Sequence, residues 1–231
     1  MKIAGLQKLT LLDFPEHTAC TVFLWGCNFR CPFCHNAGLV TQPPADEIPL
    51  AELLAFLKKR QGLLDGVCIT GGEPTLHPDL PELIRQIRAL GYQIKLDTNG
   101  TNPQMLRSLC KEGLLDMVAM DIKNAPEKYA ATAGSETLHI EQINESIRFL
   151  MQGSVPYEFR TTVVKHYHTA EDFVRIGKWI QGAEHYYLQG FRDSGNLIAE
   201  GVGGVSSAEM HKMLDAVLPF VPNAKLRGVD E

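Results

Sequence analysis

Short apolar runs and longer amphipathic segments alternate along this chain of 231 residues. The short runs are mostly uninterrupted by polar residues, which is typical of strands buried on both faces of a parallel sheet. They predict strands at residues 18–26, 66–70, 93–98, 116–122, 157–164 and 185–190.

The segments between these runs have helical spacing. Apolar stripes occur at Leu50, Leu53, Leu54 and Leu57, at Leu80, Leu83, Ile84, Ile87 and Leu90, and at Ile140, Ile143, Ile147, Leu150 and Met151. Asn102 followed by Pro103 is a typical helix start, and Gly113 is a typical stop. Ser206 and Glu209 have the spacing of a capping box.

Six strand–helix units in succession predict parallel strands with right-handed crossovers. Because a closed barrel needs eight such units, we expect an α/β fold, an open partial (β/α)6 barrel. The chain should form one domain, 1–231, with its core at about 18–200. We expect the segments 1–17 and 201–231 to flank the barrel mouth.

Composition excludes several classes of protein. Apolar residues make up 45% and charged residues 21% of the chain, as in ordinary globular proteins. The net charge of -5 argues against nucleic-acid binding, which favours a basic face. No run of about 18 uncharged apolar residues predicts a membrane span. The first residues do not resemble a secretory signal.

Three cysteines, Cys27, Cys31 and Cys34, are crowded into eight residues. Thiolates in such a group suit iron–sulfur chemistry or a soft metal. A structural zinc site would need a fourth ligand, and His35 is too near Cys34 to supply it in the usual spacing. Disulfides are disfavoured because a chain of this length can bury a core without them. Three ligands leave a metal position open, as catalytic sites do.

The other three cysteines are isolated: Cys20 and Cys68 fall in predicted strands, and Cys110 in a predicted helix. Buried free cysteines are common, so we assign all three to the core.

Polar residues follow the second and third predicted strands. Gly71 and Gly72 would let the backbone approach a ligand closely, and Glu73 would place a carboxylate beside a cationic amine. A plain strand–helix turn is the simpler interpretation. Asp97 and Asn99 either form an Asx-type turn or bind a ligand.

The later strands also carry polar side chains. Asp121 and Lys123 alternate, so both could point into one cavity or form a surface ion pair. A charge such as Arg160 inside an apolar strand needs a partner, either a ligand carboxylate or a neighbouring acid. Gln189 could reach the same ligand, and Phe33 either stacks on it or packs into the core.

Taken together, these motifs resemble those of the radical S-adenosylmethionine (SAM) proteins that activate glycyl radical enzymes. The similarity rests on the cysteine loop 27–34, the Gly-Gly-Glu-Pro turn 71–74, the segment 97–100 and the segment 121–123. The segments 9–15 and 23–36 are most like the activating proteins of anaerobic ribonucleoside-triphosphate reductase, and also resemble pyruvate formate-lyase activating enzymes.

The resemblance implies a single [4Fe–4S] cluster held by Cys27, Cys31 and Cys34, because residues 35–65 hold no further cysteine. It implies that SAM is bound by Phe33, Gly71, Gly72, Glu73, Asp97, Asn99, Asp121, Lys123, Arg160 and Gln189. A flavodoxin-like or ferredoxin-like donor would reduce the cluster, and SAM would yield a 5′-deoxyadenosyl radical that abstracts a glycine Cα hydrogen from the partner. Nothing beyond the cluster and SAM is expected to be catalytic. Deleting residues 1–13 at the mouth should impair partner activation more than SAM cleavage without a partner. An oxygen-labile cluster would favour the cytoplasm.

Three other hypotheses remain open at this point. The protein could activate a different glycyl radical enzyme, of the pyruvate formate-lyase type. It could be a radical SAM enzyme acting on a small molecule. It could also be an iron–sulfur electron carrier or redox sensor, which would not bind SAM.

Overall fold

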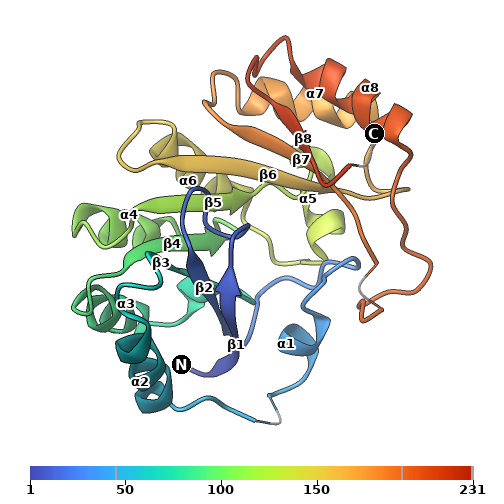
Figure 1. Ribbon diagram of the computed structural model, residues 1–231. Helices are drawn as coiled ribbons and strands as arrows, with labels where there is room; N and C mark the ends of the chain where they lie inside the picture. Colours follow the sequence, from blue (N-terminus) through green and yellow to red (C-terminus); the bar gives the residue numbers. More distant parts are fainter. Residues whose placement is uncertain (45, 194, 230–231) are drawn as a thin grey trace.

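The computed structural model describes residues 1–44, 46–193 and 195–229 (Figure 1). Its strands are β1 Ile3–Thr10, β2 Ala19–Leu24, β3 Gly66–Gly71, β4 Gln93–Thr98, β5 Met117–Asp121, β6 Tyr157–Val163, β7 Tyr186–Gly190 and β8 Lys225–Arg227. Its helices are α1 Ala37–Thr41, α2 Leu50–Arg60, η1 Pro74–Leu76 (a 3₁₀ turn), α3 Leu80–Arg88, α4 Pro103–Lys111, α5 Pro126–Ala133, α6 Ile140–Leu150, α7 Ala170–Trp179 and α8 Ser207–Val217.

All eight strands form one sheet whose spatial order, β1 to β8, is the order along the chain. Strand β1 pairs antiparallel with β2, and every later pair is parallel. The sheet runs from β1 to β8 without closing, with α2, α3 and α4 along one side and α7 and α8 beside its far end (Figure 1). An open α/β barrel is therefore confirmed.

The two faces of the sheet have different chemistry. In β4, Ile94 and Leu96 are buried in the main hydrophobic core, whereas Lys95 and Asp97 alternate with them and pair with each other. Because successive side chains of a strand point to opposite faces, the apolar face meets the helices and the polar face lines the barrel interior. Chemistry is thereby concentrated inside the barrel.

All six predicted strands are present, with ends shifted by at most two residues. The six predicted strand–helix units are β2 to β7 with the helices that follow them, and the structure adds two strands that were not predicted, β1 and β8, at the edges of the sheet. Strand β1 contains Gly5 and polar Gln7 and Lys8, which hide the strand pattern. Strand β8 has only three residues, too few for a periodicity to be recognised.

Most of segment 1–17, which was expected at the mouth, runs along the edge of the sheet as strand β1. Ile3 pairs with Leu24, at the C-terminal end of β2, whereas Thr10 pairs with Ala19 at the opposite end. Only the start of this segment therefore lies beside the mouth, because β1 runs antiparallel along the whole edge of β2.

The helix predictions are mostly confirmed. The Asn102 side chain accepts a hydrogen bond from the Met105 amide at the start of α4, and Ser206 and Glu209 form a capping box on α8. The stripe on α2 is narrower than expected, because Leu50 is exposed and Leu54 only half-buried. Within the described residues, no helix is long and apolar enough to cross a membrane.

Candidate active site

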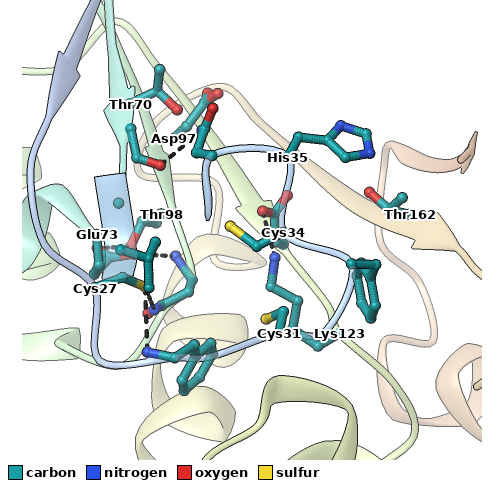
Figure 2. Close-up of a pocket in the computed structure, with 18 of the residues that line it drawn as sticks. Cys27, Cys31, Cys34, His35, Thr70, Glu73, Asp97, Thr98, Lys123 and Thr162 are labelled. Atoms are coloured by element: carbon teal, nitrogen blue, oxygen red, sulfur yellow. Dashed lines mark hydrogen bonds and ion pairs between the residues drawn. The ribbon is translucent and has the colours of Figure 1, made fainter. Parts of the chain in front are cut away.

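The loop after β2 carries Cys27, Cys31 and Cys34 at the C-terminal end of the sheet (Figure 2). Its middle is anchored from α5, since the Arg30 amide donates to the Ala133 carbonyl at 2.9 Å. Its end forms a turn in which the Cys34 amide donates to the Cys31 carbonyl at 3.0 Å. In Figure 2, Cys31 and Cys34 lie on the Lys123 side of the cavity and Cys27 on the Glu73 side.

Burial governs the acidity of these thiols. It raises the pKa of Cys27 to about 12, with a further contribution from the nearby Glu73 carboxylate. Burial also raises the pKa values of Cys31 and Cys34, against a lowering effect of Lys123. The metal-free thiols are thus protonated at neutral pH, and metal binding must displace those protons.

The cysteines do not converge on one point. Among the residues that the structure describes, no three His, Cys, Asp or Glu side chains form a group able to hold a single metal ion. A cluster of several irons needs no such convergence, because each thiolate binds a different iron. The three sulfurs that line one cavity therefore fit an iron–sulfur cluster as a donor set.

Glycines bring the turn after β3 against the cysteine loop. A Cβ atom on Gly72 would lie 1.9 Å from the Gly26 carbonyl oxygen, so only glycine fits there. Gly71 has a φ of +114°, a conformation that other residues rarely adopt. The Glu73 amide donates to Gly26 at 2.8 Å. The two glycines are thus required for the close packing of this turn against the cysteine loop, and the approach of the turn to a ligand stays a prediction.

The Glu73 carboxylate is 1% exposed and accepts four hydrogen bonds. One oxygen accepts from the Thr75 amide and hydroxyl and from the Thr98 hydroxyl at 2.7 Å, and the other accepts from the Asn99 amide at 2.6 Å. Burial raises its pKa, although these bonds oppose the shift. Glu73 is therefore held in one orientation and ties the β3 turn to the end of β4.

Asn99 forms the predicted Asx-type turn, and its predicted contact with a ligand stays a prediction. Its side-chain oxygen accepts from the Thr101 amide at 3.0 Å, which is the Asx-type turn. Its side-chain amide donates to Asn28 in the cysteine loop at 2.8 Å. The turn after β4 thus faces the cysteine loop and also lines the cavity.

Arg160 of β6 lies between two aspartates. Its Nη1 is 3.2 Å from Asp97 Oδ2, and its Nη2 is 3.0 Å from Asp121 Oδ1. Lys123 Nζ lies 2.9 Å from the other oxygen of Asp121. The partner required by the buried arginine is therefore a pair of neighbouring acids. The Asp121–Lys123 pair lines the cavity and does not lie on the outer surface.

These cations keep the aspartates ionised. Burial alone would raise the pKa of Asp121, but Lys123 and Arg160 lower it to about 2. Burial likewise opposes ionisation of Asp97, yet Arg160 and Lys95 lower its pKa. Two carboxylates and two cations consequently face the cavity at neutral pH.

Aromatic and imidazole rings form the opposite side. Phe33 is buried with its edge against Tyr167 and His168, at ring separations of 5.7 and 6.3 Å, while it also lines the cavity. His35 contacts Phe191 with ring centroids 5.3 Å apart, and burial lowers its pKa. Phe33 is therefore packed into the core and also borders the cavity, and its stacking on a ligand stays a prediction.

All thirteen residues that the sequence predicted for the site line one cavity of about 230 Å³. The sequence missed seven other lining residues: Phe29, His35, Asn36, Val40, Thr70, Thr98 and Thr162. Thr162 could have been found, since it lies two residues after Arg160 on the same strand face. Val40, on the short helix α1, offered no such signal.

Comparison with known proteins gives one family. The sequence profile described as the Radical SAM superfamily matches residues 22–180. A protein of Methanocaldococcus jannaschii named as a glycyl-radical enzyme activating enzyme is 31% identical over 196 residues, which are 82% of this chain and 79% of the relative. A GTP 3′,8-cyclase of Thermococcus kodakarensis is 31% identical over 147 residues, but the match spans only 45% of that protein.

Solved structures share the fold. The SuiB protein of Streptococcus suis bound to S-adenosylmethionine has a TM-score of 0.68 at 13% identity, over 90% of this chain and 52% of that one. A domain of pyruvate-formate lyase-activating enzyme from Bacteroides vulgatus has a TM-score of 0.57 at 17% identity, over 71% of this chain and 99% of that one.

Proposed function

Because this chain belongs to the radical SAM superfamily, we propose that its cavity binds a [4Fe–4S] cluster and SAM in order to activate a glycyl radical enzyme. The observation that carries this proposal is the gathering of three unpaired cysteines and all the predicted SAM residues around one cavity at the strand ends. An electron carrier would not require the Gly72 approach or the charged residues beside the cysteines.

The roles of individual residues follow from their positions. Cys27, Cys31 and Cys34 would hold the cluster. When bound, the cluster and SAM supply the radical chemistry, in which one electron cleaves the sulfonium S–C5′ bond to give methionine and a 5′-deoxyadenosyl radical. The carboxylates of Asp97 and Asp121 would orient polar groups of SAM, and Arg160 keeps both charged and in place.

The remaining residues position and enclose the ligand. Glu73 would accept from the SAM amine at the β3 turn, with Gly71 and Gly72 allowing the approach. Asn99, Lys123 and Gln189 would bind polar groups of SAM, and Phe33 would cover its adenine. The barrel is open between β1 and β8, which is consistent with a loop of a second protein as the substrate.

We infer that the partner is an anaerobic ribonucleoside-triphosphate reductase, because segments 9–15 and 23–36 are most like its activating proteins. The reductant would be a flavodoxin-like or ferredoxin-like protein. The proposed partners are proteins rather than nucleic acids or membranes, and an oxygen-labile cluster is best suited to the cytoplasm.

The test is anaerobic reconstitution followed by addition of SAM, reductant and the reductase, with electron paramagnetic resonance as the readout. We expect a glycyl radical doublet on the reductase. A doublet that forms only on another glycyl radical enzyme would replace the proposed partner. Formation of 5′-deoxyadenosine with no doublet on any partner would refute the activase function. Absence of SAM binding would refute the radical SAM chemistry for this chain.

A further inference from the structure

A further ion pair lies next to the charged residues of the cavity. Arg227 of β8 binds both carboxylate oxygens of Glu158 on β6, at 3.0 and 2.9 Å. Its guanidinium also stacks on the Tyr187 ring at 3.7 Å. Glu158 is only 3% exposed, and a buried carboxylate needs a cationic partner.

Glu158 is also within reach of the cavity arginine. It lies two residues before Arg160 on the same face of β6, and its Oε1 is 4.0 Å from Arg160 Nη1. That same Nη1 is 3.2 Å from Asp97. Glu158 and Asp97 therefore compete for one nitrogen of Arg160, and the present geometry favours Asp97.

We propose that Arg227 is a positioning residue for SAM binding: it neutralises Glu158 and so leaves Arg160 directed at Asp97 and Asp121. The inference rests on the proposed function, because it assumes that these aspartates orient SAM. Nothing else in the described chain is recorded as a hydrogen-bond donor to the Glu158 carboxylate. Without Arg227, the nearest cation to this buried carboxylate is Arg160.

The consequence of losing Arg227 follows from charge alone. A buried carboxylate without a partner is costly, so Arg160 would turn toward Glu158. Asp97 and Asp121 would then lose part of their guanidinium contact and shift. Losing Glu158 has no such effect, because a neutral side chain there does not attract Arg160. Arg227 would remain partly hydrated, since it is 35% exposed.

Substitution of Arg227 and substitution of Glu158 are therefore expected to have different effects on the affinity for SAM. In the reconstituted protein we expect Arg227→Gln to raise the dissociation constant of SAM about tenfold, and Glu158→Gln to change it less than about twofold. The double variant Glu158→Gln/Arg227→Gln should return to near wild-type affinity. Arg227→Lys, which keeps the charge but not the bidentate geometry, should be intermediate.

The measurements are equilibrium binding of SAM and thermal unfolding of the same samples. Arg88→Gln is the matched control, because it breaks a partly exposed ion pair to Asp116 at 2.6 Å on the outside of the fold. It should leave SAM affinity unchanged. Should Arg227→Gln not fold, Arg227→Lys and the double variant still carry the comparison.

If Arg227→Gln and Glu158→Gln weaken SAM binding equally, the ion pair is merely structural and the inference is overturned. A double variant as defective as Arg227→Gln would overturn it as well. Failure of the wild-type protein to bind SAM would refute the proposed function itself, so the two failures are distinguishable.

Discussion

The cysteines of this protein fall into two groups according to their surroundings. Cys20 and Cys68 are fully buried among strand side chains, whereas Cys27, Cys31 and Cys34 line the cavity. All five have raised pKa values because of burial. The pKa values therefore do not separate the cysteines of the core from the proposed cluster ligands, but their positions do.

We expect Cys31→Ala to abolish stoichiometric iron binding, while Cys20→Ala retains it. The reason is that only Cys31 has its sulfur at the cavity that would hold the cluster. The measurement is iron content together with the visible absorption of the reconstituted proteins. Both variants replace a buried thiol by a methyl group, so Cys20→Ala controls for loss of packing. Equal iron binding by the two would contradict the proposed ligand set.

The identity of the site residues could be predicted from the sequence, whereas their contacts with one another could not. The spacing of the three cysteines and the Gly-Gly-Glu turn need only local information. The hydrogen bonds that Glu73 accepts from Thr98 and Asn99, and the position of Arg160 between Asp97 and Asp121, join different strands. A single sequence gives no register for these pairs, so the sequence indicated that Arg160 needs a partner and left the partner open.

At the level of elements, α7 shows how a helix start is connected to the rest of the fold. Thr169 and Asp172 form a capping box, and Asp172 also accepts from Lys128 of α5 at 2.8 Å. Burial of Asp172 opposes its ionisation, but the bonds from Lys128 and Thr169 lower its pKa. The ionised carboxylate thus stabilises the folded state.

The stabilisation contributed by Asp172 depends on pH. Because the folded-state pKa of Asp172 is below the unfolded value of 3.8, its stabilisation is present above that pH and is lost as the pH falls through the folded pKa. Asp172→Asn should cost about 1 kcal/mol at pH 7, roughly 3 °C in Tm.

At pH 3 the difference in Tm between Asp172→Asn and wild type should be smaller than at pH 7. Thermal unfolding of cluster-free protein at the two pH values is the measurement, since acid also releases metal. A difference in Tm that is the same at both pH values would show that the charge of Asp172 does not stabilise the fold. Lys128→Met should reproduce part of the loss at pH 7, because it removes the cation that faces this carboxylate.

Elements were predictable where periodicity is strong and missed where it is weak. The capping box on α8 was found from Ser206 and Glu209, whereas the equivalent Thr169 and Asp172 were overlooked because Asp is less usual than Glu at that position. Strand β1 was missed because tertiary pairing with β2, and not its own composition, makes it a strand.

At the level of the whole molecule, β1 belongs to the sheet and is not an appendage at the mouth. It covers the edge of β2, the strand that leads into the cysteine loop, and Ile3 is buried in the core. Asp13 accepts a hydrogen bond from Thr21 of β2. The N-terminal segment therefore supports the strand on which the cluster site depends.

Deletion of residues 1–13 should consequently abolish SAM cleavage without a partner as well as partner activation. This outcome replaces the selective loss that the sequence suggested. The measurements are 5′-deoxyadenosine formation without a partner and the glycyl radical signal with one. Leu11→Ser/Leu12→Ser is the control, because both side chains are largely exposed, at 68% and 87%, and β1 stays intact. Retention of SAM cleavage after the deletion would favour the original prediction.

The strand order has a consequence for synthesis on the ribosome. Each strand pairs with the one made just before it, so the sheet can grow in the direction of translation. The cysteine loop follows the second strand, whereas Arg160 arrives on the sixth and Arg227 on the eighth. The proposed cluster ligands are therefore made before the charged residues of the cavity, and we expect SAM to bind only after β6 is complete; SAM bound by cluster-loaded nascent chains stalled before β6 would contradict this.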